Sequence, residues 1–231
     1  MLLLKYNSMK KYCVIPAFNE EKNIVSTVNK ALYYVDHVVV VDDCSTDKTP
    51  HEVAKINNPS VSLLRHPINL GQGAALQTGN EYALNKGADI IIHFDADGQF
   101  LAEEINHIVK PLLANDCDIV FGSRFLEIKS KIPKFKKNII MPLGRIFNYL
   151  FFKIKTSDPQ SGFRAMTRET TQKIIIENNR MAHCTEILAK AHQYNLRIKE
   201  VPITVIYYEF GQKFSGGIKI IKDLIFKKIS K

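Results

Sequence analysis

Short apolar runs alternate with amphipathic stretches along the first half of the chain. The apolar runs are rich in Val and Ile and cover residues 12–18, 37–43, 60–66, 89–97 and 118–124. Stretches with helical periodicity lie between them, at residues 20–34, 46–56, 71–86 and 102–114. Strands that are buried on both faces have such continuous apolar runs, and their alternation with helices favours a parallel sheet. The pattern predicts an α/β protein with a mostly parallel central sheet and helices on both faces.

The alternation of strands and helices stops after Arg124. A basic segment at 128–155 comes next, followed by the polar sequence TSDPQSGFR, two helical patterns near 168–178 and 185–194, and an expected strand at 197–205. No internal repeat or low-complexity linker interrupts the chain. We therefore expect one domain over residues 1–212 and a basic amphipathic helix over residues 213–231.

Composition restricts the class of protein, and the distribution of charge suggests a partner. The chain has 231 residues, of which 45% are hydrophobic and 24% charged, so it is neither disordered nor fully embedded in a membrane. The net charge of +9 is uneven, because residues 128–155 hold eight cations and no acid, and residues 213–231 hold six lysines and one acid. Such basic patches favour an anionic partner, which could be a phosphate, a nucleic acid or an anionic membrane.

Two further features bear on the compartment. The four cysteines form no C-x-x-C pair, which argues against a zinc cage or a disulfide framework and favours a reducing cytosol. The longest apolar stretch, residues 139–152, contains Pro142 and Arg145 and is shorter than the ~20 residues that a membrane-spanning helix needs. We expect no segment of this chain to cross a bilayer alone.

Acidic residues follow two of the expected strands. Asp42 and Asp43 end the second strand, and Asp95-Ala96-Asp97-Gly98-Gln99 ends the fourth. Ligands of open parallel sheets bind beyond the carboxyl ends of the strands, and two carboxylates on one short turn suit a hard divalent cation. A single such aspartate could instead cap a helix or form an Asx turn. For Asp95, Asp97 and Gln99 together, the pattern favours a site for Mg²⁺ or Mn²⁺.

The glycines do not match the common nucleotide-binding motifs of α/β proteins. PAFNEE follows the first strand, with neither G-x-G-x-x-G nor G-K-[ST]. The only Gly-rich turn, NLGQG at residues 69–73, opens the helix after the third strand. This turn could contact a ligand or could simply connect strand and helix.

Six segments, taken together, resemble glycosyltransferase family 2, and within it the polyprenyl-phosphate branch similar to dolichol-phosphate mannose synthase. They are VIPAFNEEKNI, VVVDDCSTDKT, NLGQGAALQTG, FDADGQF, GSRF and SDPQSGFR, in that order, and the resemblance covers roughly residues 11–213. It implies a GT-A fold, a nucleotide-diphosphate sugar as donor and Mg²⁺ or Mn²⁺ as cofactor. The metal residues implied are Asp95, Asp97 and Gln99, with Asp97 also catalytic, and Asp42 is expected to support its loop. The resemblance further implies a nucleotide-sugar site made of Pro16, Phe18, Glu20, Asp43, Asp95, Ala96, Gln99 and Lys213.

The resemblance also implies an acceptor. Members of this branch use a lipid phosphate, which is already ionised and needs no general base. Arg124 would then bind the acceptor phosphate with help from Arg164, and the lysines of the basic segment would attract the headgroup or the membrane, unless that segment is only a solvated loop. Were the acceptor a sugar hydroxyl, Asp158 would be the best-placed base, although it could equally organise the loop before Pro159.

The carboxyl-terminal region departs from the family pattern. Relatives often carry an arginine before G-x-S-K, where this chain has Tyr208, Glu209 and Phe210, so that Lys213 would keep the diphosphate contact. Many relatives continue into transmembrane helices, whereas this sequence ends at Lys231 after an amphipathic stretch that could lie in a membrane interface or dock on the domain. We expect peripheral attachment at the cytosolic face, or completion by a separate small membrane protein.

The favoured function is therefore inverting, metal-dependent transfer of a sugar from a nucleotide-diphosphate sugar to a polyprenyl phosphate. One alternative is a transferase that acts on a sugar hydroxyl in surface-polysaccharide synthesis. Another is a catalytically silent subunit that binds a nucleotide sugar. Nucleic-acid binding is suggested by charge alone, and we expect no nucleic-acid partner.

Overall fold

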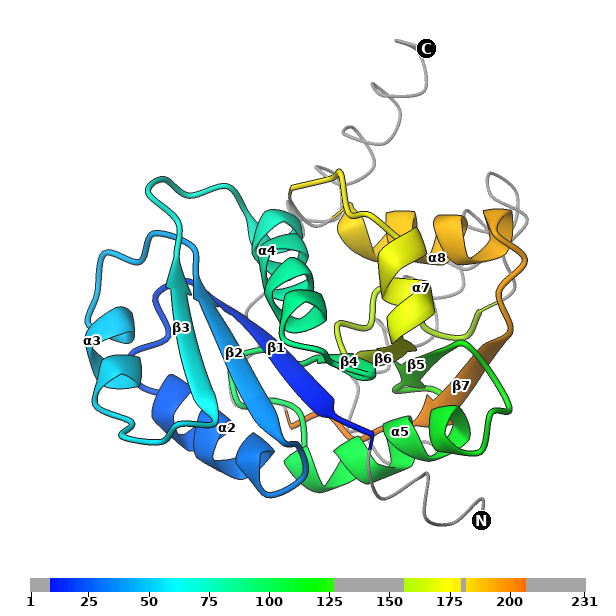
Figure 1. Ribbon diagram of the computed structural model, residues 1–231, viewed down its shortest axis with the longest axis horizontal. Helices are drawn as coiled ribbons and strands as arrows, with labels where there is room; N and C mark the ends of the chain where they lie inside the picture. Colours follow the sequence, from blue (N-terminus) through cyan, green and yellow to red (C-terminus); the bar gives the residue numbers. More distant parts are fainter. Residues whose placement is uncertain (1–8, 127–155, 180–181, 207–231) are drawn as a thin grey trace, which may run out of the picture.

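The computed structural model describes residues 9–126, 156–179 and 182–206. Its centre is a seven-stranded sheet with the order β3-β2-β1-β4-β6-β5-β7 (Figure 1). Pairing is parallel except at β6, which runs antiparallel to both of its neighbours. The strands are β1 (Lys11–Ala17), β2 (His37–Asp42), β3 (Val61–Arg65), β4 (Ile90–His93), β5 (Ile119–Ser123), β6 (Arg164–Thr167) and β7 (Ile198–Pro202).

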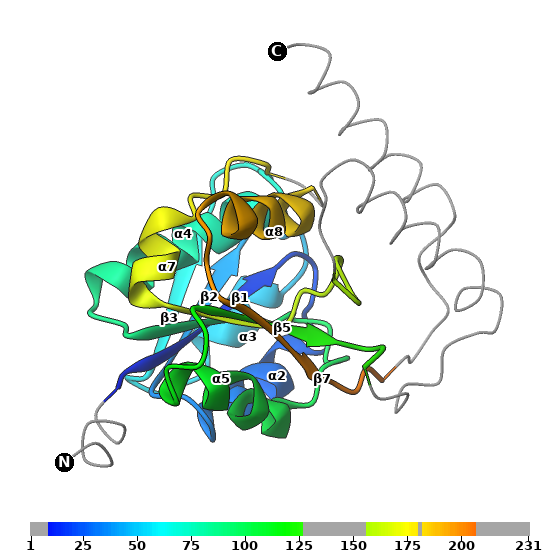
Figure 2. The same ribbon diagram turned by 90° about the vertical axis from the view of Figure 1, so that its right-hand side faces the viewer.

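Helices cover both faces of the sheet. They are α2 (Ile24–Leu32), α3 (Thr49–Ala54), α4 (Gln72–Asn85), the short 3₁₀ helix η1 (Ala102–Glu104), α5 (Ile105–Leu113), α7 (Arg168–Lys173) and α8 (His183–Gln193). Figure 2 shows the two layers, with α4, α7 and α8 on one side of the sheet and α2 and α5 on the other. The predicted α/β architecture, mostly parallel and covered on both faces, is confirmed.

Alternation along the strands divides the core into two layers. In β1, Cys13 and Ile15 pack toward α2 and α5, whereas Tyr12 and Val14 pack toward α4 and α8. Every second residue of a strand points to the same face, so a run that is apolar at every position serves both layers. This is why the apolar runs in the sequence were continuous.

The order in which strands are added to the sheet reverses between β1 and β4. From β1 the chain adds β2 and β3 on one side and then returns to place β4 on the other. Pairing of β1 with β4 ends at Val14↔His93, and Pro16, two residues further, has no N–H with which to extend that ladder. The two strands therefore separate at their carboxyl ends, at the switch point where open α/β sheets bind ligands.

Several sequence-based boundaries need correction. β6 was not predicted, because it has only four residues and begins with an arginine. The helix expected over 20–34 begins at Ile24, and the one expected over 168–178 ends at Lys173. The basic segment 128–155 lies outside the described residues, as do Lys213 and the helix expected over 213–231.

Candidate active site

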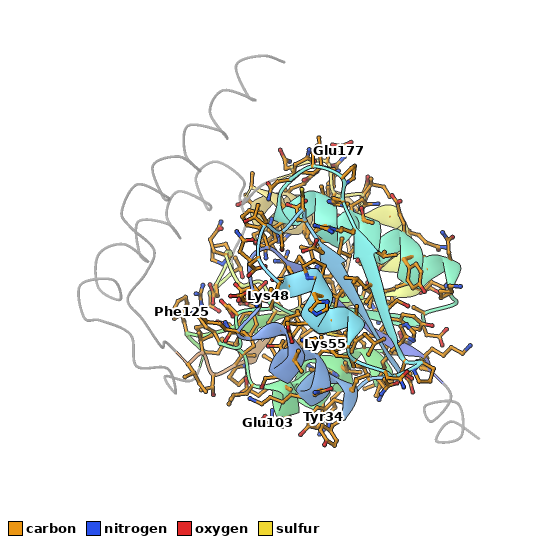
Figure 3. The ribbon with its side chains drawn as sticks, turned by 90° about the vertical axis from the view of Figure 1, so that its left-hand side faces the viewer. Tyr34, Lys48, Lys55, Glu103, Phe125 and Glu177 are labelled. Atoms are coloured by element: carbon orange, nitrogen blue, oxygen red, sulfur yellow. The ribbon has the colours of Figure 1, made fainter. Side chains whose placement is uncertain are left out.

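The loops that follow β1 and β2 are joined by a network of hydrogen bonds. The N–H of Asn19 donates to Ser45 Oγ (2.9 Å), and its side-chain oxygen accepts from the N–H of Thr46 (2.8 Å). Lys48, labelled in Figure 3 at the start of α3, donates its N–H to Glu21 (3.0 Å). Asn19 can adopt the required left-handed conformation, with φ at 58°, because Asn tolerates it better than most residues. The pair of loops thus forms one rigid rim at the switch point.

Two of the residues expected on this rim differ in exposure. The Phe18 ring is 46% exposed, so it is open to a ligand. Pro16 is buried within β1, where it shapes the separation of the strands and does not line an open surface. That Pro16 lines the base and ribose pocket therefore stays a prediction.

Asp42 and Asp43 both accept hydrogen bonds from the main chain of loops at the site. Asp42 is fully buried and accepts from the N–H of Ser45, as the sequence suggested for a supporting residue. Asp43 is only 3% exposed, and its carboxylate accepts from the N–H groups of Leu70 (2.9 Å) and Gly71 (2.7 Å). The ring of His66 adds a third bond to the same carboxylate, at 2.8 Å. Asp43 therefore anchors the Gly-rich turn, and its expected place in the base and ribose pocket stays a prediction.

The acidic turn after β4 lies at the carboxyl end of that strand. Gly98, with φ at 74°, allows the chain to reverse, and the N–H of Gln99 donates to Asp97 Oδ1 (3.0 Å). Thr27 Oγ1 of α2 donates to the carbonyl oxygen of Ala96 (3.2 Å), which ties the turn to the helix. Ala96 therefore contributes through its main chain, while its side chain is 4% exposed.

Asp95 is held by two other parts of the chain. Gln72, in the first turn of α4, donates its side-chain amide to Asp95 Oδ1 (2.9 Å). On the other side, the backbone of Gly162 approaches so closely that a Cβ built on it would lie 2.4 Å from Asp95 Oδ2. The Gly-rich turn, the acidic turn and the SGFR segment thus meet at one carboxylate.

Burial, together with the charge of Asp97, raises the affinity of the nearby acidic groups for protons. Burial, with a smaller contribution from the charge of Asp97, raises the pKa of Asp95 to about 7. Burial also raises the pKa of Asp97, although the N–H of Gln99 opposes it. The pKa of Glu20 is raised by burial and by the charges of Asp97 and Asp47, which places Glu20 beside the same turn. Asp97 therefore lies close enough to Asp95 and to Glu20 for its charge to act on both carboxyl groups.

The donor set suits a divalent cation that is shared with a ligand. Carboxylate and amide oxygens are the groups that Mg²⁺ and Mn²⁺ prefer, and a bound cation would favour the ionised form of two carboxyl groups whose pKa values burial raises. Among the described residues, no three His, Cys, Asp or Glu side chains gather into a cage that could hold a metal alone. The residues present thus fit a cation whose remaining ligands come from a bound diphosphate and water.

Arg124 and Asp158, predicted for separate roles, bind each other. Arg124 follows β5, and its Nε and Nη2 donate to the two carboxylate oxygens of Asp158, each at 2.6 Å. The N–H of Arg124 donates to the same carboxylate at 3.1 Å. The Asp158 side chain is 2% exposed and that of Arg124 is 22% exposed. A buried carboxylate that accepts three bonds from one residue orients the guanidinium, and this arrangement leaves Asp158 poorly placed to act as a general base.

Arg164 is also corrected by the structure. It opens β6 with no exposed surface, and its Nη2 donates to the carbonyl oxygen of Ser161 (2.8 Å) and to Cys184 Sγ (3.2 Å). Burial raises the pKa of the Cys184 thiol, but His183 and Arg164 more than offset this, and the pKa falls to about 6. An acceptor phosphate cannot reach Arg164 in this position. Its charge instead acts on Asp95 from inside the domain, where it lowers the pKa of that carboxylate.

One short segment connects the two halves of the site. Asp158, which holds Arg124, and Gly162, which touches Asp95, are four residues apart. Four residues span at most about 14 Å between their Cα atoms, so the segment that holds Arg124 and the segment that packs on Asp95 are close neighbours. β6 makes this possible, because it runs antiparallel and so begins, at Arg164↔His93, beside the carboxyl end of β4.

Sequence analysis did not find the residues that support these groups. Gln72, His66 and Glu200 each bind a part of the site, and they come from α4, the end of β3 and β7. The Gly-rich turn NLGQG was the available signal for Gln72, because this residue is part of that turn. Gln99 is placed beside the acidic turn through its main chain, while Lys213 lies outside the described residues. No helix among the described residues is long and apolar enough to cross a membrane.

Comparisons with known proteins agree with this geometry. The model of a family described as glycosyl transferase family 2 matches residues 12–175. The UDP-N-acetylglucosamine–dolichyl-phosphate N-acetylglucosaminyltransferase of Methanococcus voltae is 33% identical over 95% of this chain and 96% of its own. The undecaprenyl-phosphate mannosyltransferase of Micrococcus luteus is 28% identical over 91% of this chain and 89% of its own. In structure, the glucosyl-3-phosphoglycerate synthase of Mycobacterium tuberculosis with Mn²⁺ and UDP-glucose gives a TM-score of 0.74 at 18% identity, over 99% of this chain and 81% of that one.

Proposed function

This chain belongs to glycosyltransferase family 2 and is a nucleotide-sugar-dependent transferase with a GT-A fold, and we propose that its acceptor is a polyprenyl phosphate. Two relatives support the acceptor, since their names give different sugars and different lipids but a polyprenyl phosphate in each case. We propose further that the transfer is metal-dependent and inverts the anomeric carbon. The observation that carries the proposal is the short connection between the acidic turn and Arg124 through residues 158–162.

The acidic turn suits the leaving group. Breaking the bond between the sugar and the diphosphate leaves a growing negative charge on the diphosphate. A divalent cation, when bound by Asp95, Asp97 and the Gln99 side chain, would supply Lewis-acid stabilisation of that charge. Gln72 holds Asp95 through its amide, and the Gln99 N–H orients Asp97, so both carboxylates are positioned in advance. Phe18 and Glu20 lie on the rim where the nucleotide would bind.

Arg124 suits the acceptor. Its guanidinium is oriented by Asp158 and remains 22% exposed, so it can donate to a phosphate oxygen. In the proposed step, an oxygen of the lipid phosphate forms a bond to the anomeric carbon as the carbon–oxygen bond to the diphosphate breaks. The electron pair leaves with the diphosphate, and a single displacement of this kind inverts the carbon. The attacking oxygen is already ionised, so no proton has to be removed.

A sugar hydroxyl as acceptor would need a base, and this geometry disfavours it. Asp158, the candidate from sequence, is buried and bound by Arg124 through both oxygens. The basic segment 128–155 joins the described residues beside Arg124 at one end and Thr156 at the other. We propose that this segment brings the site to an anionic membrane surface on the cytosolic side.

The test is a transfer assay with the full chain. Purified protein with Mn²⁺ and a panel of nucleotide sugars is offered either a polyprenyl phosphate or an oligosaccharide, and we expect transfer to the lipid phosphate. Asp97→Asn should lower turnover by about 10²–10³-fold, the usual effect of removing one electrostatic contact to the transition state. Asp116→Asn, an exposed aspartate that pairs with Lys199, is the matched control.

Two outcomes would contradict the proposal. Transfer only to the oligosaccharide would overturn the acceptor assignment, and full activity of the Asp97→Asn variant would overturn the metal assignment. Binding of nucleotide sugars without transfer to either acceptor would favour the silent binding subunit.

A further inference from the structure

Glu200 of β7 binds the polypeptide just before Asp158. One carboxylate oxygen accepts from Thr156 Oγ1 (2.7 Å), Ser157 Oγ (2.8 Å) and, more weakly, the N–H of Asp158 (3.3 Å). The N–H of Ser157 donates to both oxygens at 3.0 Å. A carboxylate with this many donors fixes the path of three consecutive residues, because moving any one of them breaks a charge-assisted bond.

The sheet places Glu200 for this contact. β7 is parallel to β5, with Phe121↔Glu200 and Ser123↔Pro202 in register. Both strands run toward the site edge, so Glu200 lies just short of the point where β5 delivers Arg124. Ser123 and Ser157 are also joined through their hydroxyl groups, which brings the end of β5 against the same three residues.

A chain of contacts therefore leads from Glu200 to the exposed guanidinium. Glu200 fixes the main chain of Ser157 and Asp158. The position of the Asp158 main chain sets the position of its carboxylate. Arg124 in turn donates three hydrogen bonds to that carboxylate. A guanidinium held by two parallel bonds can rotate only if its partner moves. The orientation of the partly exposed Arg124 guanidinium thus depends on a residue two contacts away.

We propose that Glu200 is a positioning residue for the acceptor phosphate, acting through Asp158 on Arg124. The inference rests on the proposed function, since it takes Arg124 to be the group that binds the phosphate. It assigns to Glu200 a role in the use of the acceptor and none in the binding of the donor. The donor is expected at the acidic turn, to which Glu200 makes none of its hydrogen bonds within the described part of the chain.

The test separates acceptor kinetics from donor binding. Glu200→Gln keeps the size of the side chain but removes its charge and points an amide at groups that donate. We expect kcat/KM for the polyprenyl phosphate to fall by about 10- to 100-fold, as expected when a reacting group is misplaced by up to about 1 Å. The Kd for the nucleotide sugar, measured by calorimetry with Mn²⁺, should change less than about twofold, in keeping with the small effect of changes that touch no ligand contact.

Asp118→Asn is a matched control at the opposite edge of the same strands. Asp118 accepts from the N–H of Arg197 (2.8 Å) and from its guanidinium (2.8 Å), which repeats the chemistry of the Asp158 site far from Arg124. The control should change thermal stability but leave acceptor kinetics unchanged. If it impairs acceptor use as much as Glu200→Gln does, the effect is general loosening of the sheet and the proposal is wrong.

A double-mutant cycle with Arg124→Ala decides the mechanism. If Glu200 acts through Arg124, adding Glu200→Gln to Arg124→Ala should cause little further loss; additive losses would overturn the proposal. If Arg124→Ala itself leaves acceptor use intact, the assignment of Arg124 fails instead, so the two failures are distinguishable. Should Glu200→Gln not fold, Thr156→Val removes one donor to Glu200 and keeps the charge, and acceptor kcat/KM unchanged in that variant would also count against the proposal.

Discussion

Gly162→Ala should disable the acidic turn without disturbing the fold. A Cβ at residue 162 would lie 2.4 Å from Asp95 Oδ2 and 2.9 Å from the other oxygen, Oδ1. Non-bonded carbon and oxygen atoms do not approach below about 3.0–3.4 Å, so the carboxylate must retreat by roughly 0.6–1 Å. A displacement of this size in a reacting group can cost about 100-fold in rate. We therefore expect turnover to fall by about two orders of magnitude.

The assay compares metal affinity, turnover and stability in one variant. Titration of Mn²⁺ in the presence of the nucleoside diphosphate, followed by calorimetry, should show a loss of affinity parallel to the loss of turnover. The melting temperature should change little, because no apolar contact is removed.

Gly87→Ala is the control, because it should lower stability but leave Mn²⁺ affinity and turnover unchanged. Gly87 lies after α4 with φ at 81°, and a Cβ there would meet nothing within 4 Å. The left-handed backbone makes an Ala residue cost about 1–2 kcal/mol of stability, while Asp95 is untouched. If Gly162→Ala keeps its Mn²⁺ affinity within about twofold of wild type, a difference under 0.5 kcal/mol, Asp95 is not a ligand and the argument is refuted.

Two further predictions concern protonation and the acceptor. Since the pKa of Asp95 is raised from 3.8 to about 7, protons compete with the cation, and Mn²⁺ affinity should rise between pH 6 and pH 8; equal affinities would contradict this. By linkage, the native state binds the extra proton in this range, so metal-free stability should fall as the pH rises from 3.8 toward 7, which thermal melts would detect. Asp158→Asn removes the charge that holds Arg124, a loss of about 1.5–3 kcal/mol, and should raise KM for the lipid phosphate by about 10- to 100-fold. A fall in kcat of about 10²–10⁴-fold with KM unchanged would instead indicate a general base.

The sequence was sufficient where the relevant residues are neighbours along the chain. Asp95 and Asp97 could be predicted because they directly follow an apolar strand, and the carboxyl ends of parallel strands form the ligand edge. The strands themselves could be predicted from their continuous apolar runs, except for β6, whose four residues carry no such run.

The sequence was not sufficient where the chemistry depends on distant pairing. Arg124 and Asp158 were both selected, but their separation by 34 residues hid the ion pair that makes one the support of the other. The support that Asp43 gives to Leu70 and Gly71 could not be predicted, because these partners come 27 and 28 residues later. Arg164 was expected to assist at the acceptor phosphate from the family resemblance, although it is the largest fully buried side chain among the described residues.

The contacts of Ser123 with Ser157 and of Arg124 with Asp158 have a consequence for the evolution of this enzyme. These contacts join the end of β5 to residues 157 and 158, which lie on either side of residues 127–155 in the sequence. The entropic cost of closing a loop between two fixed ends grows only slowly with the length of the loop. Insertions or deletions between the two fastened points would therefore leave the sheet intact, so that this connection could change in length while the sugar-transferring machinery stays the same.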